Sequence, residues 1–127
     1  MNEKNNHLIA LADRNGLSFY DVNDIIRCES DNSTTSVIVR VEEAKRERVA
    51  KIYVSKNIKQ LEDLLCCKGM FFRIHNKHLI NIKYINKYFK IDGGYLVMNL
   101  DSDVKIPVAR ARREEFIKYL KSIGAVL

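Results

Sequence analysis

The stretch FFRIHNKHLIN, residues 71–81, decides the fold, because two β-rich runs flank a polar and basic centre. Residues 71–74 and 79–82 carry the aromatic and β-branched side chains that favour strands. Asn76 and Lys77 lie between them, a turn-forming residue and a cation. The stretch therefore predicts two strands joined by a basic loop.

Short strands are predicted along most of the remaining chain. Val37, Val39 and Val41 alternate with Ile38 and Arg40, which predicts a half-buried strand over residues 36–42. Further strands are predicted over residues 8–12, 17–20, 25–29, 48–54, 87–91, 95–100 and 105–108. Residues 31–35 predict a polar loop, residues 42–47 a hairpin connection without Asn-Gly, and residues 92–94 a hairpin turn.

Two helices complete the prediction. Ser55 can cap a first helix, whose end Gly69 marks, because apolar residues recur at helical spacing between them. A second helix is predicted over residues 111–123, with Phe116 on its inner face. The expected fold is mainly β with about two short helices, in a single domain ordered from about residue 8 to 124.

Length and composition are those of an ordinary soluble domain. The chain has 127 residues, of which 46% are hydrophobic, enough for one real core. No apolar run approaches the roughly 18 residues needed to span a bilayer, and residues 1–7 are polar rather than an apolar signal core. The three cysteines, with Cys66 and Cys67 adjacent, do not predict a disulfide scaffold. We therefore expect a cytoplasmic protein.

The net charge of +6 is concentrated in the second half of the chain. Residues 1–67 hold 10 Lys and Arg against 11 Asp and Glu, whereas residues 68–127 hold 12 against 5. Residues 68–91 contain six positive side chains and no acid, and the charges alternate with apolar residues as on one face of a strand. A local positive field of this kind predicts a polyanionic partner.

Other chemistries find little support. His75 and His78 near Cys66 and Cys67 suggest zinc, but adjacent cysteines cannot form the usual chelate and no further Cys/His pair exists. The same residues lack an orienting acid for Cys–His catalysis, and Gly93-Gly94 lacks the lysine of a phosphate-binding loop. We expect neither enzymatic activity nor a metal or cofactor.

Two stretches combine the residue types that DNA recognition requires. They are residues 71–81 and residues 107–116, which include Arg110, Arg112 and Arg113. Lysine and arginine neutralise phosphates, arginine can bind guanine through two hydrogen bonds, and asparagine can bind adenine in the same way. Asn76 is therefore a candidate base reader, while His75 is expected to shape the loop or to contact DNA.

These stretches, with IIRCES at residues 25–30 and SKNIKQLE at residues 55–62, resemble the LytTR DNA-binding domain family. The four motifs follow in the family's order, across about residues 8–122. The resemblance implies an elongated β fold whose loops, rather than a recognition helix, enter successive major grooves. It further implies that Thr35, Asn76 and Arg110 contact bases. The residues implied as backbone contacts are Arg73, Lys77, Lys83, Arg112 and Arg113.

Three residues depart from the family pattern. Asn76 stands where the family often has Lys or Arg, and Lys77 and Ala109 stand where it often has Ser. These departures leave the fold secure but make the preferred DNA sequence unpredictable.

The resemblance implies a bacterial transcription regulator that binds double-stranded DNA, with two copies on directly repeated sites. The chain would act alone or as the output domain of a two-component response regulator, behind a receiver domain. A protein-interaction module of the same fold, which modulates a partner regulator without reading DNA, is the alternative. A third hypothesis is single-stranded RNA binding, with bases stacked on Phe71, Phe72, Tyr84, Tyr88 and Phe89.

Overall fold

The computed structural model describes residues 7–68 and 70–126. Within them the fold is mainly β with two α-helices, as predicted. The strands are β1 (Leu8–Asp13), β2 (Gly16–Asp21), β3 (Ile25–Asp31), β4 (Thr34–Glu43), β5 (Arg46–Val54), β6 (Phe71–His75), β7 (His78–Asn81), β8 (Ile85–Phe89), β9 (Tyr95–Met98) and β10 (Asp101–Pro107). The helices are α1 (Ile58–Leu65) and α2 (Arg113–Ser122), and a 3₁₀ turn, η5 (Arg110–Arg112), precedes α2.

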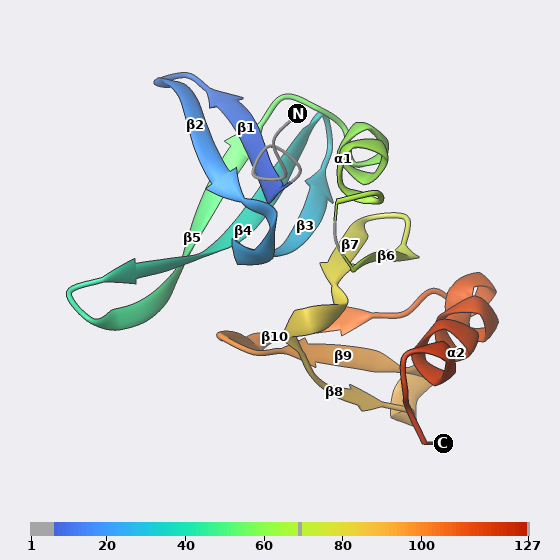
Figure 1. The fold of residues 1–127 in the computed structure, drawn as a ribbon. Helices are drawn as coiled ribbons and strands as arrows, with labels where there is room; N and C mark the ends of the chain where they lie inside the picture. Colours follow the sequence, from blue (N-terminus) through green and yellow to red (C-terminus); the bar gives the residue numbers. More distant parts are fainter. Residues whose placement is uncertain (1–6, 69, 127) are drawn as a thin grey trace.

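The described strands form three antiparallel sheets (Figure 1). The central sheet has the order β5-β4-β3-β7-β6, so that residues from both halves of the chain pair through β3 and β7. β1 and β2 form a hairpin beside it, and β10-β9-β8 form a separate three-stranded sheet. The β4–β5 hairpin extends beyond the other strands as an arm (Figure 1).

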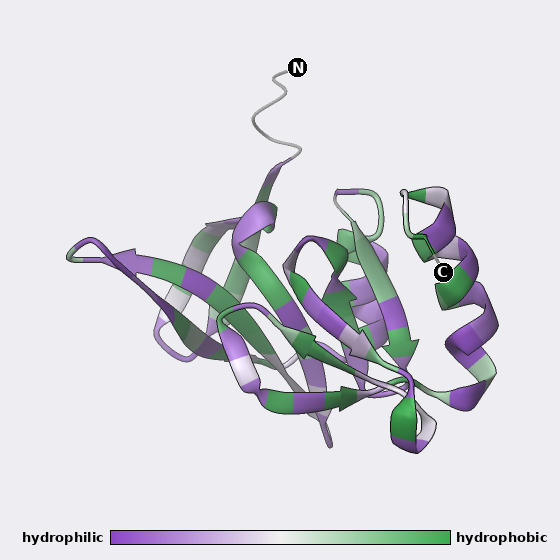
Figure 2. Ribbon diagram, turned by 90° about the horizontal axis from the view of Figure 1, so that it is seen from below, coloured by the Kyte–Doolittle hydropathy of each residue, from purple (hydrophilic) through white to green (hydrophobic). Residues whose placement is uncertain are grey.

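The central sheet is covered on both faces. Val37 and Val39 belong to a core with β1 and α1, whereas Ile38 between them belongs to a core with β9, β10 and α2. The prediction of a half-buried strand at residues 36–42 is therefore wrong for its first half, because a second layer covers the other face. Figure 2 shows the alternation along the β4–β5 arm as green and purple bands.

Helix α1 begins later than predicted. Asn57, rather than Ser55, is its N-cap: the Asn57 side chain accepts from the Gln60 backbone N–H, and the Gln60 side chain accepts from the Asn57 N–H. This reciprocal capping box satisfies two backbone N–H groups at the helix start. Leu61 and Leu65 are fully buried. The predicted end at Gly69 lies outside the described residues.

Three further element boundaries differ from prediction. β7 ends at Asn81, because the Asn81 side chain accepts from the Lys83 N–H and caps a 3₁₀ turn. Helix α2 begins at Arg113 rather than residue 111, after η5. β10 begins at Asp101, four residues earlier than predicted, and Asp101 is paired with the buried Arg27 of β3.

Arg27 of β3 connects the central sheet to the sheet formed by β8, β9 and β10. Its side chain is only 4% exposed, and its Nε donates to Oδ2 of Asp101 at 2.6 Å while its Nη1 donates to Oε1 of Glu29 at 2.7 Å. A buried guanidinium is tolerated only where carboxylates compensate its charge in this way. Burial raises the pKa of Glu29, but the hydrogen bond and charge of Arg27 outweigh it and lower that pKa overall.

Candidate nucleic-acid interface

Three segments that are far apart in the sequence meet at one edge of the central sheet (Figure 1). The Ser30 N–H, beside the β3–β4 turn, donates to the Lys77 carbonyl in the β6–β7 turn at 2.8 Å. The Ala109 N–H, beside η5, donates to the Ile74 carbonyl of β6, also at 2.8 Å. We call this the turn edge; it consists of residues 32–33, 76–77 and 110–112.

The β6–β7 turn presents an exposed amide beside an exposed cation. Asn76 and Lys77 form a two-residue turn between the paired residues His75 and His78, and both are exposed. Among the described residues, no hydrogen bond occupies the Asn76 side chain. His75 is half-buried, and its Nδ1 accepts from the Lys77 N–H at 3.1 Å. This hydrogen bond ties the His75 ring to the backbone of the turn.

Arg73 supports the same turn from beneath. Its side chain is 12% exposed, and it donates to the carbonyls of His75 (3.0 Å) and Asn76 (2.6 Å) and to Oε1 of Glu62 (2.9 Å). A guanidinium has five N–H groups. Most of the N–H groups that were expected to contact phosphate therefore donate to acceptors within the protein.

The third segment carries the arginines. Arg110 is exposed at the start of η5, whereas Arg112 and Arg113 are half-buried. Nη1 of Arg112 donates to the Arg73 carbonyl at 3.2 Å, which fastens η5 to β6. Arg113 lies beside Gly93: a Cβ atom at position 93 would lie 2.9 Å from Nη2 of Arg113. Asn76 and Arg110, predicted as base readers from separate motifs, are therefore brought to one edge.

Thr35 is placed differently from the prediction. It lies in β4, is fully buried, and its hydroxyl donates to the Lys56 carbonyl at 2.7 Å. The polar loop predicted over residues 31–35 shortens to a turn at Asn32 and Ser33, both exposed, with Asn32 at φ 56°. A buried, bonded hydroxyl cannot contact DNA without rearrangement of β4, so we do not keep Thr35 among the candidate readers.

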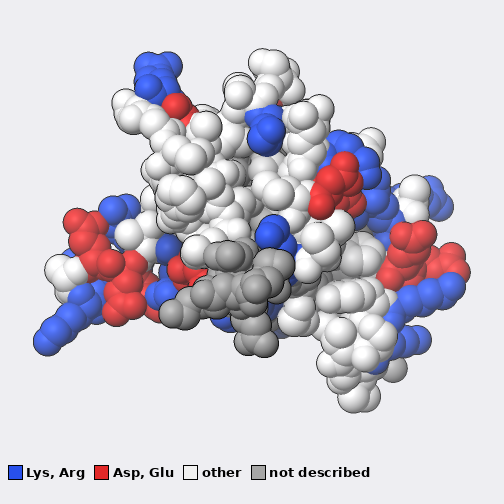
Figure 3. Space-filling view, turned by 45° about the horizontal axis from the view of Figure 1, so that its top comes forward, with Lys and Arg blue, Asp and Glu red and all other residues white. Residues whose placement is uncertain are grey.

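Lys83 is also separated from the turn edge. It lies beyond the far end of β7, in an open cleft with Asp24, Arg40 and Glu47. Figure 3 shows Lys and Arg side chains along the right side of the molecule, interrupted by red patches, whereas the β4–β5 arm on the left mixes both signs.

Asn32, Ser33 and Glu62 were not predicted as site residues. Asn32 and Ser33 are exposed because β4 begins only after them, at Thr34.

His78 adds a buried titratable group behind the turn. It is 12% exposed, and its Nδ1 lies 3.8 Å from Oε1 of Glu29 and has no hydrogen-bond partner among the described residues. Burial lowers the pKa of His78 from 6.5 to about 4, more than the nearby Glu29 charge raises it. The imidazole is therefore neutral at pH 7.

The cysteines and the aromatic residues lie in different environments. Cys66 and Cys67 are exposed, and no group of three or more His, Cys, Asp or Glu residues there could hold a metal ion. Burial raises the pKa of the third thiol, Cys28, to about 12. Phe72 packs on Phe116 with ring centroids 5.5 Å apart, and Tyr84 is buried, so neither offers a free face for a base.

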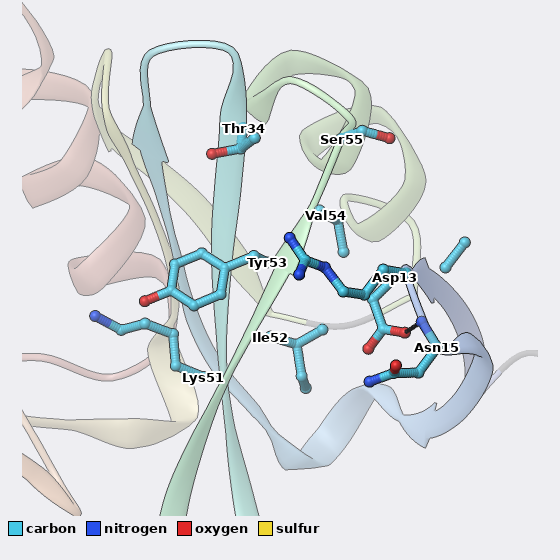
Figure 4. Close-up of a pocket in the computed structure, with 10 residues that line it drawn as sticks. Asp13, Asn15, Thr34, Lys51, Ile52, Tyr53, Val54 and Ser55 are labelled. Carbon is cyan, nitrogen blue, oxygen red and sulfur yellow. Dashed lines mark hydrogen bonds between the residues drawn. The ribbon is translucent and has the colours of Figure 1, made fainter.

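A cleft of about 700 Å³ opens between the β1–β2 turn and β5 (Figure 4). Its lining includes Thr34, Lys51 and Tyr53, and Oδ1 of Asp13 accepts from the Asn15 N–H at 2.8 Å (Figure 4). This lining contains one carboxylate, that of Asp13, and no histidine or cysteine. No described helix is long and apolar enough to cross a membrane.

The chain is similar to known proteins in sequence and in fold. The family model of the LytTr DNA-binding domain matches residues 15–121. The heme-containing CO-sensing transcriptional regulator RcoM 1 of Paraburkholderia xenovorans (strain LB400) is 25% identical over 109 residues, which are 84% of this chain and 37% of that protein. The chain thus spans well under half of that relative.

A solved structure shares the fold. It is the LytTr DNA-binding domain of a putative methyl-accepting/DNA response regulator from Bacillus cereus. It superposes with a TM-score of 0.65 over 94% of this chain and 98% of that chain, at 17% sequence identity.

Proposed function

The chain belongs to the LytTR DNA-binding domain family, a family of DNA-binding transcription regulators, and from this premise we propose that it reads a specific sequence in double-stranded DNA. The observation that carries the proposal is the turn edge, where Asn76 and Arg110 are exposed on segments joined through β6. Their side chains have the donors and acceptors that distinguish bases in the major groove.

In this mechanism the turns enter the DNA grooves and the strands stay outside. Asn76 reads an adenine through its amide, and Arg110 reads a guanine in a neighbouring groove. The exposed Asn32 and Ser33 replace Thr35 as the candidate contacts of the third segment. Lys77, Arg112 and Arg113 contact phosphates, which position the protein without specifying sequence.

We extend the proposal to assembly on DNA. Two copies occupy directly repeated sites, and the chain regulates transcription in a bacterium either alone or as the output domain behind a receiver domain.

A protein-interaction module is the second candidate function. It is favoured by the outer face of the β1–β2 hairpin, where Leu17 is 58% exposed and Phe19 is 66% exposed. Exposed apolar patches of this kind mark protein contacts.

Selection of bound duplexes from a random DNA pool tests the proposal. The wild-type protein should enrich one motif and lose affinity steeply with salt. Arg110→Ala should lose about 1–3 kcal/mol of discrimination at its base. Lys77→Ala should weaken all duplexes about equally, whereas Lys83→Ala, remote from the turn edge, serves as the matched control and should change little. Enrichment of no motif by the wild-type protein would favour the protein-interaction module instead.

A further inference from the structure

Arg73 is a basic residue that the protein has turned inward. Three of its N–H groups donate to the His75 carbonyl, the Asn76 carbonyl and the Glu62 carboxylate, all within 3.0 Å. Its side chain is 12% exposed. A guanidinium has five N–H groups, so these three bonds leave only two for a phosphate contact. These contacts do not fit the role implied for Arg73 by the family resemblance.

The two carbonyls that Arg73 holds belong to the turn that presents Asn76. Strand β6 has a register shift between Arg73 and His75, so the ladder does not fix this end of the strand by itself. The Lys77 N–H is held by His75, and the Lys77 carbonyl is held by Ser30. The turn backbone is therefore bonded from several sides, while the Asn76 side chain stays exposed.

Glu62 anchors this arrangement to the core. It lies on α1, between Leu61 and the Leu64–Leu65 pair, and Leu61 and Leu65 are fully buried. Its side chain is 27% exposed, and its Oε1 accepts from Arg73 at 2.9 Å. A helix with a capping box and two buried leucines is a rigid support. The position of the turn thus depends on a carboxylate outside the turn edge.

We propose that Arg73 and Glu62 are positioning residues that hold the β6–β7 turn in the geometry with which Asn76 reads its base. The inference rests on the proposed function and deepens it: specificity at the Asn76 base pair is set partly from helix α1. A reader that is already ordered loses less side-chain and backbone freedom on binding, and a misplaced one loses its paired hydrogen bonds.

A positioning residue and a phosphate contact predict different binding data. Loss of a phosphate contact weakens binding to every duplex and lowers the slope of log K against log salt by about one. Loss of a positioning residue leaves binding to random DNA and the salt slope unchanged, and reduces only the preference for the selected duplex. Arg73→Lys separates the two roles, because lysine keeps the charge but cannot donate in three fixed directions.

The experiment uses the full chain, with binding to the selected duplex and to a random duplex measured at several salt concentrations. Glu62→Gln and Arg73→Lys should each lower the preference for the selected duplex by about 3- to 10-fold. Asp63→Asn is the matched control: it removes the same charge from the next residue of α1, which is 65% exposed and pairs with Lys59. It should leave the preference unchanged.

Two further measurements distinguish positioning from general destabilisation. In an Asn76→Ala background, Glu62→Gln should cause no additional loss of preference, because the residue that it positions is absent. In a random-pool selection, Glu62→Gln should lose information only at the base pairs that Asn76→Ala affects, and those assigned to Arg110 should keep theirs.

The outcomes are separable. If the wild-type protein prefers one duplex and Glu62→Gln behaves as Asp63→Asn does, the positioning role is rejected and the proposed function stands. If Arg73→Lys keeps the full preference, a positive charge at position 73 is sufficient, and the positioning role of Arg73 is rejected. If the wild-type protein shows no preference, the proposed function fails and this inference fails with it.

Discussion

The β6–β7 and β4–β5 hairpins both turn in two residues, but different interactions hold the two turns. Ala44 and Lys45 adopt φ values of 52° and 65°, a left-handed geometry that matches strand twist but costs non-glycine residues energy. Asn76 and Lys77 avoid positive φ. Arg73 donates to the Asn76 carbonyl, Ser30 of the neighbouring strand donates to the Lys77 carbonyl, and the Lys77 N–H donates to the His75 ring. The backbone ladder therefore holds the turn of the long β4–β5 arm, whereas side-chain hydrogen bonds hold the turn of the short β6–β7 hairpin.

The shorter of the two hairpins is the one that needs support from side chains. β4 and β5 pair at nine positions, so their ladder determines the register of the arm up to its turn. β6 and β7 pair at only four positions, with a shift in register among them. A short ladder cannot define the end of its own turn, and the residues that do so become part of the functional site.

The largest expected effect is the loss of stability when Arg73 is removed from the β6–β7 hairpin, compared with the removal of an arginine from the β4–β5 hairpin. Arg73→Ala should lower the free energy of unfolding by about 2–4 kcal/mol, because Glu62 and two turn carbonyls lose their partner in a partly buried site. Arg48→Ala, in the arm, removes a pair with Glu43 whose side chains are 54% and 65% exposed, and should cost less than about 0.5 kcal/mol. Urea denaturation measures both, and equal losses would contradict the difference that we draw between the two hairpins.

A smaller effect should appear on acidification, through His78 at the base of the β6–β7 turn. Its pKa is about 4 in the folded protein and about 6.5 when unfolded, so the unfolded chain binds the proton first. The free energy of unfolding should therefore fall between pH 6.5 and 5, by about 1–2 kcal/mol. His78→Leu should flatten this slope.

This pH range avoids the titration of a nearby carboxyl group, that of Glu29. The lowered pKa of Glu29 also makes the folded state less stable in acid, but this loss belongs to pH values below its ordinary 4.5. A wild-type slope that persists unchanged in His78→Leu would assign the titration to another group.

The smallest expected effect is a gain. Ala44→Asn with Lys45→Gly places the residues that tolerate positive φ in the arm, and should raise the free energy of unfolding by about 1 kcal/mol while DNA binding stays constant. Lys77→Gly should give no such gain, because that position does not need positive φ. Thermal unfolding compares the two, and stabilisation of both turns alike would remove the distinction between them.

Much of the fold follows from local sequence pattern. The alternation around Val37 predicts β4, and the β-rich runs around Asn76 predict β6 and β7, because period and residue type are local signals. The same signals cannot show what covers each face. Val37, Ile38 and Val39 look half-buried in sequence, and are buried only because two layers enclose the sheet.

The site was predicted less completely, because exposure and bonding are not local. Asn76 and Arg110 are exposed as a reader must be. Thr35 resembles a loop residue in a run of polar side chains, yet β4 begins at Thr34 and buries it. Arg73 has the charge of a phosphate contact, but its acceptors come from α1 and from the turn beyond it. No pattern in the sequence relates Glu62 to that turn.

The Arg27–Asp101 pair has a consequence for the order of folding. It joins positions 74 residues apart and links the central sheet to the sheet formed by β8, β9 and β10. Closing so long a loop is entropically costly, and contacts of high sequence separation slow the folding of β proteins. We therefore expect the ion pair to form late, when the two sheets dock. Arg27 and its two carboxylates would then stay hydrated until they pair, so that no unpaired charge is buried during folding.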